Sequence, residues 1–278
     1  MVHVLTTREE VRTVLAGLSQ RPGLVPTMGA LHAGHASLIT RSAKENAASV
    51  VSIFVNPTQF GSAQDLDRYP RVLDTDVAIA AASGATFVFA PSAREIYGDD
   101  FDTWVEVPGL AKMWEGASRP GHFRGVCTVV SILLNLVEPG RSYFGEKDFQ
   151  QLQIIRRMHH DLALPGEIIG CPTERDVDGV ALSSRNDRLS LAGRRRAAEI
   201  PRAISAIQDA VALGETSTRP LIELGQSILH AVDVSMDYLA IVNPQSLSPE
   251  TTIHDGDRIL VAVVIDGVRL IDNASVTG

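Results

Sequence analysis

The stretch from Leu24 to His35, which reads LVPTMGALHAGH, constrains the fold of this chain more than any other. Leu24 and Val25 form a short apolar run after a Pro-Gly pair, which is typical of a buried strand in a parallel sheet. Pro26 and Gly29 end that strand, and a helical pattern of apolar residues begins at His35. We therefore expect a strand, a tight turn and a helix N-terminus in direct succession.

Two histidines, His32 and His35, lie at the start of the expected helix. A helix N-terminus presents free N–H groups and the positive end of a dipole, so it favours an anion such as phosphate. Two other interpretations stay open, namely solvated histidines or half of a zinc site. Cys127 and Cys171 are the only cysteines and are far apart without CxxC pairing, which argues against zinc.

Composition narrows the class of protein. The chain has 278 residues, of which 21% are charged, as in ordinary globular proteins. Its net charge of −8 argues against a surface that binds nucleic acid. Charged residues break up the first twenty positions, so we expect no signal peptide. The longest apolar run, from Val126 to Val137, falls short of the roughly 20 residues that a bilayer span needs. Two unpaired cysteines suit a reducing cytoplasm.

Strand and helix patterns alternate along the first part of the chain. This alternation predicts an α/β fold, a Rossmann-like doubly wound parallel sheet. Expected strands are 24–25, 49–55, 85–90, 141–144 and 168–169, with a possible β excursion at 101–107. Helices are expected over 7–18, from 35 onward, and over 74–83, 126–137 and 149–162. Thr7 and Glu10 are expected to form a capping box at the start of the first helix.

The pattern changes after about Glu174. Helices are expected over 194–213 and 219–232, and strands over 236–242, 259–265 and 268–271. The Asp266-Gly267 pair would join the last two strands as a hairpin. We predict a domain over residues 1–173 that binds nucleotide and substrate, and a smaller α+β C-terminal lid domain over residues 174–278.

Polar loops follow several expected strands, where open parallel sheets bind ligands. Asn56 and Gln59 follow the second strand, although Asn56 could instead only cap the turn. The loop 119–125 could form an anion-facing edge or carry ordinary surface charges. Lys147 lies at another strand-to-helix turn, with Gln151 just inside the helix, and the loop 178–186 offers two serines and an arginine to phosphate oxygens.

Seven motifs taken together resemble those of the pantoate–beta-alanine ligase family. They occur in the family's order and cover nearly the whole chain, and each is modest alone. They are PTMGALHAGH (26–35), FVNPTQFG (54–61), RPGHFRGV (119–126), FGEKDFQQL (144–152), DGVALSSRN (178–186), DYLAIV (237–242) and RLIDN (269–273).

The resemblance implies a nucleotidyltransferase-superfamily enzyme with an HxGH motif. ATP and (R)-pantoate would give pantoyl adenylate and pyrophosphate, and beta-alanine would then attack the adenylate, giving pantothenate and AMP. Mg²⁺ would accompany the ATP, and no protein nucleophile would be needed. The resemblance also implies a cytoplasmic homodimer that binds small molecules, with no nucleic-acid or membrane partner.

The resemblance also implies roles for individual residues. His35 would donate a proton, His32 would act beside it, and Lys147 and Arg185 would neutralise the phosphates. Gln59 and Gln151 would hold pantoate, with Gln59 also near beta-alanine and Asn56 beside them. The expected ATP-binding residues are Met28, Gly29, Ala30, Leu31, His32, Ala33, Gly34, His35, Gly145, Glu146, Lys147, Asp148, Glu174, Leu182, Ser183, Ser184 and Arg185.

Glu174 departs from the family pattern, which usually has a small apolar residue after Pro172-Thr173. We expect its side chain to point to solvent. Two other functions stay open from the residues alone. One is a related nucleotidyltransferase acting on a phosphorylated small molecule, which would need no pair of glutamines around a hydroxy acid. The other is a non-catalytic module that binds ATP without forming pyrophosphate.

Overall fold

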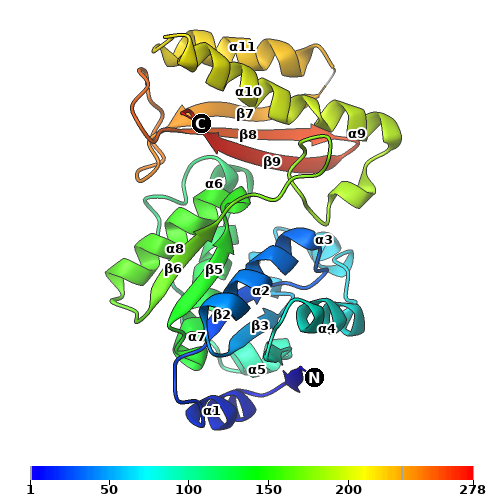
Figure 1. Ribbon diagram of the computed structural model, residues 1–278, viewed down its shortest axis with the longest axis vertical. Coiled ribbons are helices and arrows are strands. Elements are labelled where there is room, and N and C mark those ends of the chain that lie inside the picture. The colour runs from blue at the N-terminus through cyan, green and yellow to red at the C-terminus, as the bar shows by residue number, and fades with distance from the viewer. Residues whose placement is uncertain (1, 233, 278) are drawn as a thin grey trace. The chain divides into compact units, whose positions relative to one another are not determined.

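The computed structural model describes residues 2–232 and 234–277. The chain divides into two compact units, one made of Met1–Glu146 with Gln150–Pro172 and the other of Lys147–Phe149 with Thr173–Gly278. Figure 1 labels the helices and strands of both. None of the helices in the described part of the chain is both long and apolar enough to cross a membrane.

The first unit contains a six-stranded, all-parallel sheet with the order β1-β4-β3-β2-β5-β6. Its strands are β1 (His3–Leu5), β2 (Gly23–Thr27), β3 (Ser49–Ile53), β4 (Phe87–Phe89), β5 (Arg141–Gly145) and β6 (Glu167–Cys171). Leu24 and Val25 are both fully buried on β2, as a strand covered on both faces requires. The predicted Rossmann-like sheet is confirmed.

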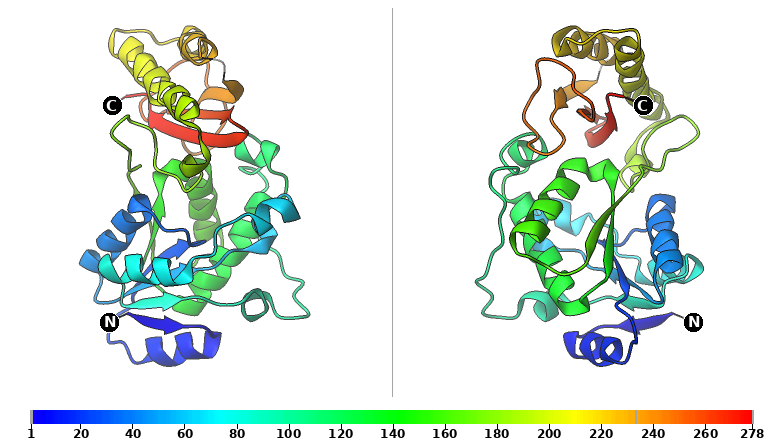
Figure 2. Two further views of the ribbon diagram at one scale, coloured as in Figure 1. Left: turned by 90° about the vertical axis from the view of Figure 1, so that its right-hand side faces the viewer. Right: turned by 60° about the vertical axis from the view of Figure 1, so that its left-hand side comes forward.

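Helices cover both faces of this sheet. They are α1 (Arg8–Ala16), α2 (Ala33–Glu45), α3 (Ala63–Asp67), α4 (Leu73–Ala82), α5 (Ala93–Tyr97), α6 (Glu115–Ser118), α7 (His122–Val137) and α8 (Phe149–Asp161), with short 3₁₀ turns η1 (Pro57–Gln59) and η2 (Glu146–Asp148). Figure 2 shows α2 and α4 on one face and α7 and α8 on the other. The predicted capping box of α1 is present, because Thr7 and Glu10 exchange hydrogen bonds at its start.

The strand order creates a switch point between β2 and β5. The chain runs from β2 outward to β3 and β4 on one side, and from β5 outward to β6 on the other, while β2 and β5 pair directly. In open α/β sheets, ligands bind beyond the carboxyl ends of the strands at such a switch point. Residues 28–32 follow β2, and Glu146 follows β5, so both lie at this edge.

The second unit has a three-stranded antiparallel sheet, β7-β8-β9. Its elements are η3 (Asn186–Arg188), α9 (Leu191–Ala197), α10 (Glu199–Ala212), α11 (Thr218–His230), β7 (Ser235–Val242), β8 (Arg258–Ile265) and β9 (Val268–Ser275). Helices α10 and α11 cover one face of the sheet (Figure 1), and an apolar core that includes Ile207, Leu221 and Val263 lies in this unit. The α+β character predicted for this part of the chain is confirmed.

The predicted Asp266-Gly267 hairpin joins β8 to β9. Ile265 pairs with Val268 across it, and Asp266 and Gly267 have φ angles of 53° and 72°. Two successive left-handed residues are the signature of the tight turn whose twist matches that of the strands it joins.

Three local predictions are wrong. Residues 101–107 form no strand, since the Val105 N–H donates to the hydroxyl of Thr128 on α7 rather than to a neighbouring strand. The loop expected over 119–125 ends early, because α7 begins at His122 after Gly121 in a left-handed conformation. The helix expected over 194–213 is two helices, and the break at Ala198 places Pro201 in the first turn of α10, where a proline costs no helical hydrogen bond.

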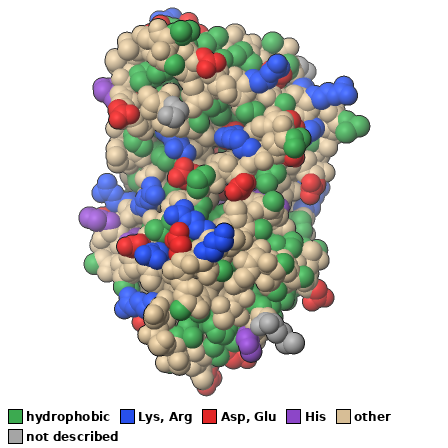
Figure 3. Space-filling model, viewed as in Figure 1, with side chains coloured by type: hydrophobic (Ala, Val, Ile, Leu, Met, Phe, Trp, Pro, Cys, Tyr) green, Lys and Arg blue, Asp and Glu red, His purple; other side chains and the backbone are tan. Residues whose placement is uncertain are grey.

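Charges are mixed on the surface. On the face drawn in Figure 3, Lys and Arg side chains lie among Asp and Glu side chains. Several such pairs are within ion-pair distance, including Arg41 with Glu45 at 2.8 Å and Arg141 with Glu167 at 3.2 Å. On this face, charges of both signs are interspersed, as is common on the surfaces of globular proteins.

Candidate active site

The turn after β2 has the backbone that the sequence predicts. Gly29 and Ala30 have φ angles of 81° and 51°, and α2 begins three residues later. Gly29 is required twice over, because its φ is left-handed and because a Cβ there would lie 2.8 Å from the Asp76 carboxylate. The predicted succession of strand, tight turn and helix N-terminus is confirmed.

His32 and His35 interlock at the N-terminus of α2. His32 is the N-cap, and its Nδ1 accepts the Gly34 N–H at 3.1 Å. The His35 Nδ1 accepts the His32 N–H at 3.3 Å, and the two ring centroids are 4.2 Å apart. Because both Nδ1 atoms act as acceptors, each neutral ring carries its proton on Nε2. The pair therefore places two imidazole rings side by side at the positive end of a helix dipole.

A buried carboxylate from α4 holds this turn in place. Asp76 is 1% exposed. It accepts the Ala30 N–H at 3.0 Å and the Leu31 N–H at 2.7 Å. These two N–H groups directly precede the histidine pair, so Asp76 fixes the path of the chain into His32. The sequence analysis did not single out this residue.

Asn56 and Gln59 lie together after β3. The Asn56 amide donates to Gln59 Oε1 at 3.0 Å and to the Gly125 carbonyl at 3.1 Å, while its Oδ1 accepts from the Tyr97 hydroxyl at 2.5 Å. The Asn56 Oδ1 also caps the turn by accepting the Thr58 N–H. The side chain of Asn56 is thus committed within the protein, and it orients Gln59.

Gln59 is held through its side chain and through its backbone. Its side-chain amide contacts the Met28 sulfur at 2.8 Å, which links it to the histidine turn. Its backbone carbonyl accepts from His122 Nδ1 at 2.8 Å and from Arg119 at 3.4 Å. Arg119 and His122 belong to the polar motif 119–126, so this motif supports Gln59 through its backbone. The sequence analysis noted the motif but could not find its partner, which lies 63 residues away from His122.

The remaining predicted residues of the first unit lie nearby in the chain. Gly145 ends β5 and Glu146 begins η2, at the carboxyl edge next to the histidine turn. Gln151 is half-buried in the first turn of α8. Its neighbour Gln150 is structural, because its side chain is buried and bonds the Glu115 N–H and the carbonyls of Leu110 and Met113.

The other predicted residues belong to the second unit. The Lys147 carbonyl accepts from the Asn273 amide at 2.8 Å, which ties Lys147 to β9. The backbone between Glu174 and Leu182 closes on itself through a 2.9 Å hydrogen bond. The half-buried stretch Leu182, Ser183, Ser184 and Arg185 follows this hydrogen bond, and Asp148 is exposed.

An ion pair anchors this part of the second unit to its sheet. Arg175 donates to both carboxylate oxygens of Asp272, at 2.6 and 3.0 Å, and Asp272 is buried on β9. The bidentate geometry fixes the start of the loop that carries the two serines. Glu174, next to Arg175, is exposed. Its side chain therefore points to solvent, as we expected.

Comparison with known proteins shows to which family the chain belongs. A family model described as Pantoate-beta-alanine ligase matches residues 3–275. The chain belongs to the pantoate–beta-alanine ligase family. It is 50% identical to the pantothenate synthetase of Deinococcus radiodurans, over 95% of this chain and 96% of that one. It is 46% identical to the pantothenate synthetase of Thermus thermophilus, over 99% of both chains.

Solved structures of the family have the same fold. A crystal structure of the Thermus thermophilus enzyme matches with a TM-score of 0.96 at 45% identity, over the whole of both chains. A Francisella tularensis pantoate–beta-alanine ligase, described as complexed with beta-gamma ATP and beta-alanine, matches with a TM-score of 0.83 at 35% identity over 100% of this chain and 99% of that one. The α/β fold and the small antiparallel sheet of this chain are therefore those of the family.

Proposed function

We propose that this chain condenses (R)-pantoate with beta-alanine at the expense of ATP, through a pantoyl adenylate, and releases pantothenate, AMP and pyrophosphate. Membership of the ligase family supports this function. The observation that carries it is the pair of interlocked imidazoles at the start of α2, at the switch point of the sheet. Donors placed there can stabilise negative charge that develops on a phosphate during nucleotidyl transfer.

The chain's own residues suit the first step. The pantoate carboxylate attacks the α-phosphate of ATP, so positioning and charge stabilisation supply most of the catalysis. In this proposal the Nε2–H groups of His32 and His35 donate to the phosphate oxygens. Lys147 and Arg185, with Ser183 and Ser184, neutralise the phosphates and the departing pyrophosphate.

Substrate selection is assigned to the glutamines. An amide both donates and accepts, so Gln59 and Gln151 match a molecule that carries a hydroxyl and a carboxylate. Gln59 is 7% exposed and held through both its side chain and its backbone. A side chain fixed in this way loses little entropy when it binds its ligand.

Magnesium fits this site as part of the nucleotide. Mg²⁺ keeps several waters and is usually bound by one or two carboxylates together with substrate phosphates. In this proposal the ion is carried mainly by the phosphates of ATP. When bound, it would neutralise phosphate charge. We also propose that the protein is a homodimer, on the basis of family membership. We propose a cytoplasmic location because its two cysteines are free and buried.

ATP–pyrophosphate exchange tests this function. Purified protein with Mg²⁺ and ATP is assayed with and without (R)-pantoate. Exchange that depends on pantoate is expected, because pyrophosphate re-enters only through the acyl adenylate. Exchange with a phosphorylated small molecule but not with pantoate would indicate a different nucleotidyltransferase. ATP binding without any exchange would indicate a binding module and refute the proposal.

A further inference from the structure

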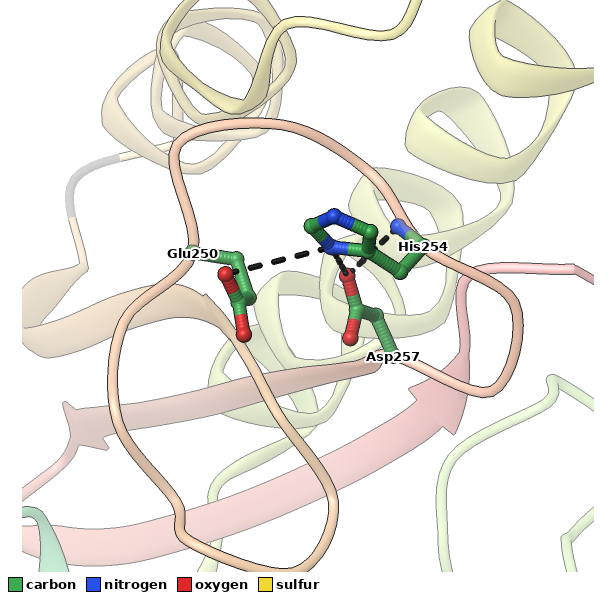
Figure 4. Close-up of side chains that lie close together, drawn as sticks. All are labelled: Glu250, His254 and Asp257. Atoms are coloured by element: carbon green, nitrogen blue, oxygen red, sulfur yellow. Dashed lines mark hydrogen bonds and ion pairs between the residues drawn. The ribbon is translucent and has the colours of Figure 1, made fainter.

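Three potential metal ligands converge in the loop that joins β7 to β8. His254 Nδ1 lies 3.5 Å from Asp257 Oδ2 and 3.9 Å from Glu250 Oε2, as the close-up in Figure 4 shows. The three ligand atoms all lie within 4.8 Å of one another, and no other such group occurs among the described residues. None of these residues belongs to the motifs assigned to catalysis.

Asp257 is the buried member of this cluster, and one of its carboxylate oxygens lacks a partner in the described part of the chain. Its side chain is only 1% exposed, and it points at the imidazole of His254 (Figure 4). One oxygen, Oδ2, accepts the His254 N–H at 2.8 Å. The other, Oδ1, is buried and has no hydrogen-bond partner in the described part of the chain. Buried carboxylate oxygens without a partner are rare and costly, so each calls for a ligand or a donor.

The backbone holds the three side chains in place. The Glu250 N–H donates to the Ile241 carbonyl of β7, and the Glu250 carbonyl accepts from the Thr218 hydroxyl of α11. The Asp257 N–H donates to the His254 carbonyl at 3.2 Å and closes the turn between them. Both ends of the cluster are thus fixed by hydrogen bonds that do not involve the ligand atoms.

We propose that Glu250, His254 and Asp257 bind a divalent transition-metal ion of the zinc class. Ligand atoms of a tetrahedral zinc site lie roughly 3.3–3.6 Å apart, given zinc–ligand bonds of about 2.0–2.2 Å. The separation between His254 and Asp257 already fits, and that between His254 and Glu250 needs to shrink by a few tenths of an ångström. The two carboxylate oxygens, which lie within 4.8 Å of each other, would be drawn together by the ion. An imidazole ligand favours zinc-class ions over Mg²⁺ and Ca²⁺, which prefer oxygen.

The proposed ion cross-links the loop. It joins a residue that follows β7 to the residue that directly precedes β8, and it neutralises two carboxylates that otherwise repel each other. The fourth position belongs to water, because His254 is 63% exposed. The expected role is stabilisation of the second unit, since nothing in the proposed reaction uses these residues.

Zinc binding to the full-length protein tests the proposal. Protein treated with a chelator and then freed of it is titrated with ZnCl₂ by calorimetry, and its melting temperature is measured across the same zinc concentrations. His254→Gln removes the exposed ligand without touching the core. His160→Gln is the matched control, because His160 is also exposed and lies 3.0 Å from a carboxylate, that of Asp161.

The expected result is a wild-type site of 1:1 stoichiometry whose affinity falls at least about tenfold in His254→Gln and in Glu250→Gln. The melting temperature should rise with zinc in the wild type and in His160→Gln, but not in His254→Gln. ATP–pyrophosphate exchange should be unchanged in His254→Gln. Absence of zinc binding, or equal binding by His254→Gln and wild type, would overturn the proposal without bearing on the ligase function.

Discussion

Replacing Asp76 by Asn tests whether a single buried carboxylate sets the geometry of the histidine turn. In the native chain both carboxylate oxygens accept backbone N–H groups, from Ala30 and Leu31. Asn has the same shape but only one acceptor oxygen. Its amide nitrogen must therefore face one of the two N–H groups, so that donor meets donor.

The magnitude follows from those two bonds. A hydrogen bond to a charged acceptor contributes about 1.5–3 kcal/mol, and a buried N–H left without a partner costs about 1–3 kcal/mol. Losing one bond and weakening the other should lower the free energy of unfolding by about 3 kcal/mol. At about 2–4 °C per kcal/mol for a domain of this size, the melting temperature of the first unit should fall by about 6–12 °C. Because the turn leads directly into His32, we also expect exchange activity to fall about 10²-fold, as misplacement by about 1 Å does.

Circular dichroism melts and ATP–pyrophosphate exchange, both begun at room temperature, measure the two effects separately. Asp74→Asn is the matched control, because Asp74 lies in the same first turn of α4 and is exposed. The control should melt and react like the wild type. An Asp76→Asn protein that is folded at room temperature and exchanges at the wild-type rate would refute the positioning role. Unchanged melting would refute the energetic argument as well.

Three further predictions concern single residues. His35→Ala should lose about 10²-fold or more in exchange activity, as removal of one transition-state donor does, with an unchanged circular dichroism spectrum; wild-type activity would exclude the assigned role. Burial raises the pKa of Cys127 to about 12, so its thiol stays protonated in mildly alkaline buffer and should react with a thiol reagent only after unfolding; rapid labelling of the native protein would contradict this. Glu174→Val should leave the KM for ATP within a few-fold, because Glu174 is exposed; a tenfold fall in KM would show that the glutamate obstructs the nucleotide.

The elements that the sequence predicts well are those whose cause is local. Thr7 and Glu10 cap α1 across three residues, and Asp266-Gly267 needs only its own φ angles to form a hairpin. Elements were missed where the cause is distant. The three-residue strand β1 exists only because it pairs with β4, which lies far along the chain. No propensity within so short a segment could reveal it.

The same division holds for the candidate site. The sequence predicts that His32, His35 and Gln59 are site residues, because each lies in a recognisable turn after a strand. It does not predict the groups that hold them, since Asp76 lies 45 residues from the Leu31 N–H that it accepts and His122 lies 63 residues from Gln59. Such pairs depend on how α4 and α7 pack against the sheet.

Close packing of α7 against the Asn56–Gln59 turn limits which residues can occupy position 125. A Cβ at Gly125 would lie 2.5 Å from the Thr58 carbonyl, so α7 can approach the Asn56–Gln59 turn only because residue 125 is a glycine. That approach brings the Gly125 carbonyl to the Asn56 amide. The motif RPGHFRGV thus makes two hydrogen bonds to one turn. The Gly125 carbonyl accepts from the Asn56 amide, and the His122 ring donates to the Gln59 carbonyl. A substitution that enlarges residue 125 should therefore displace Gln59, although residue 125 has no side chain to offer a substrate.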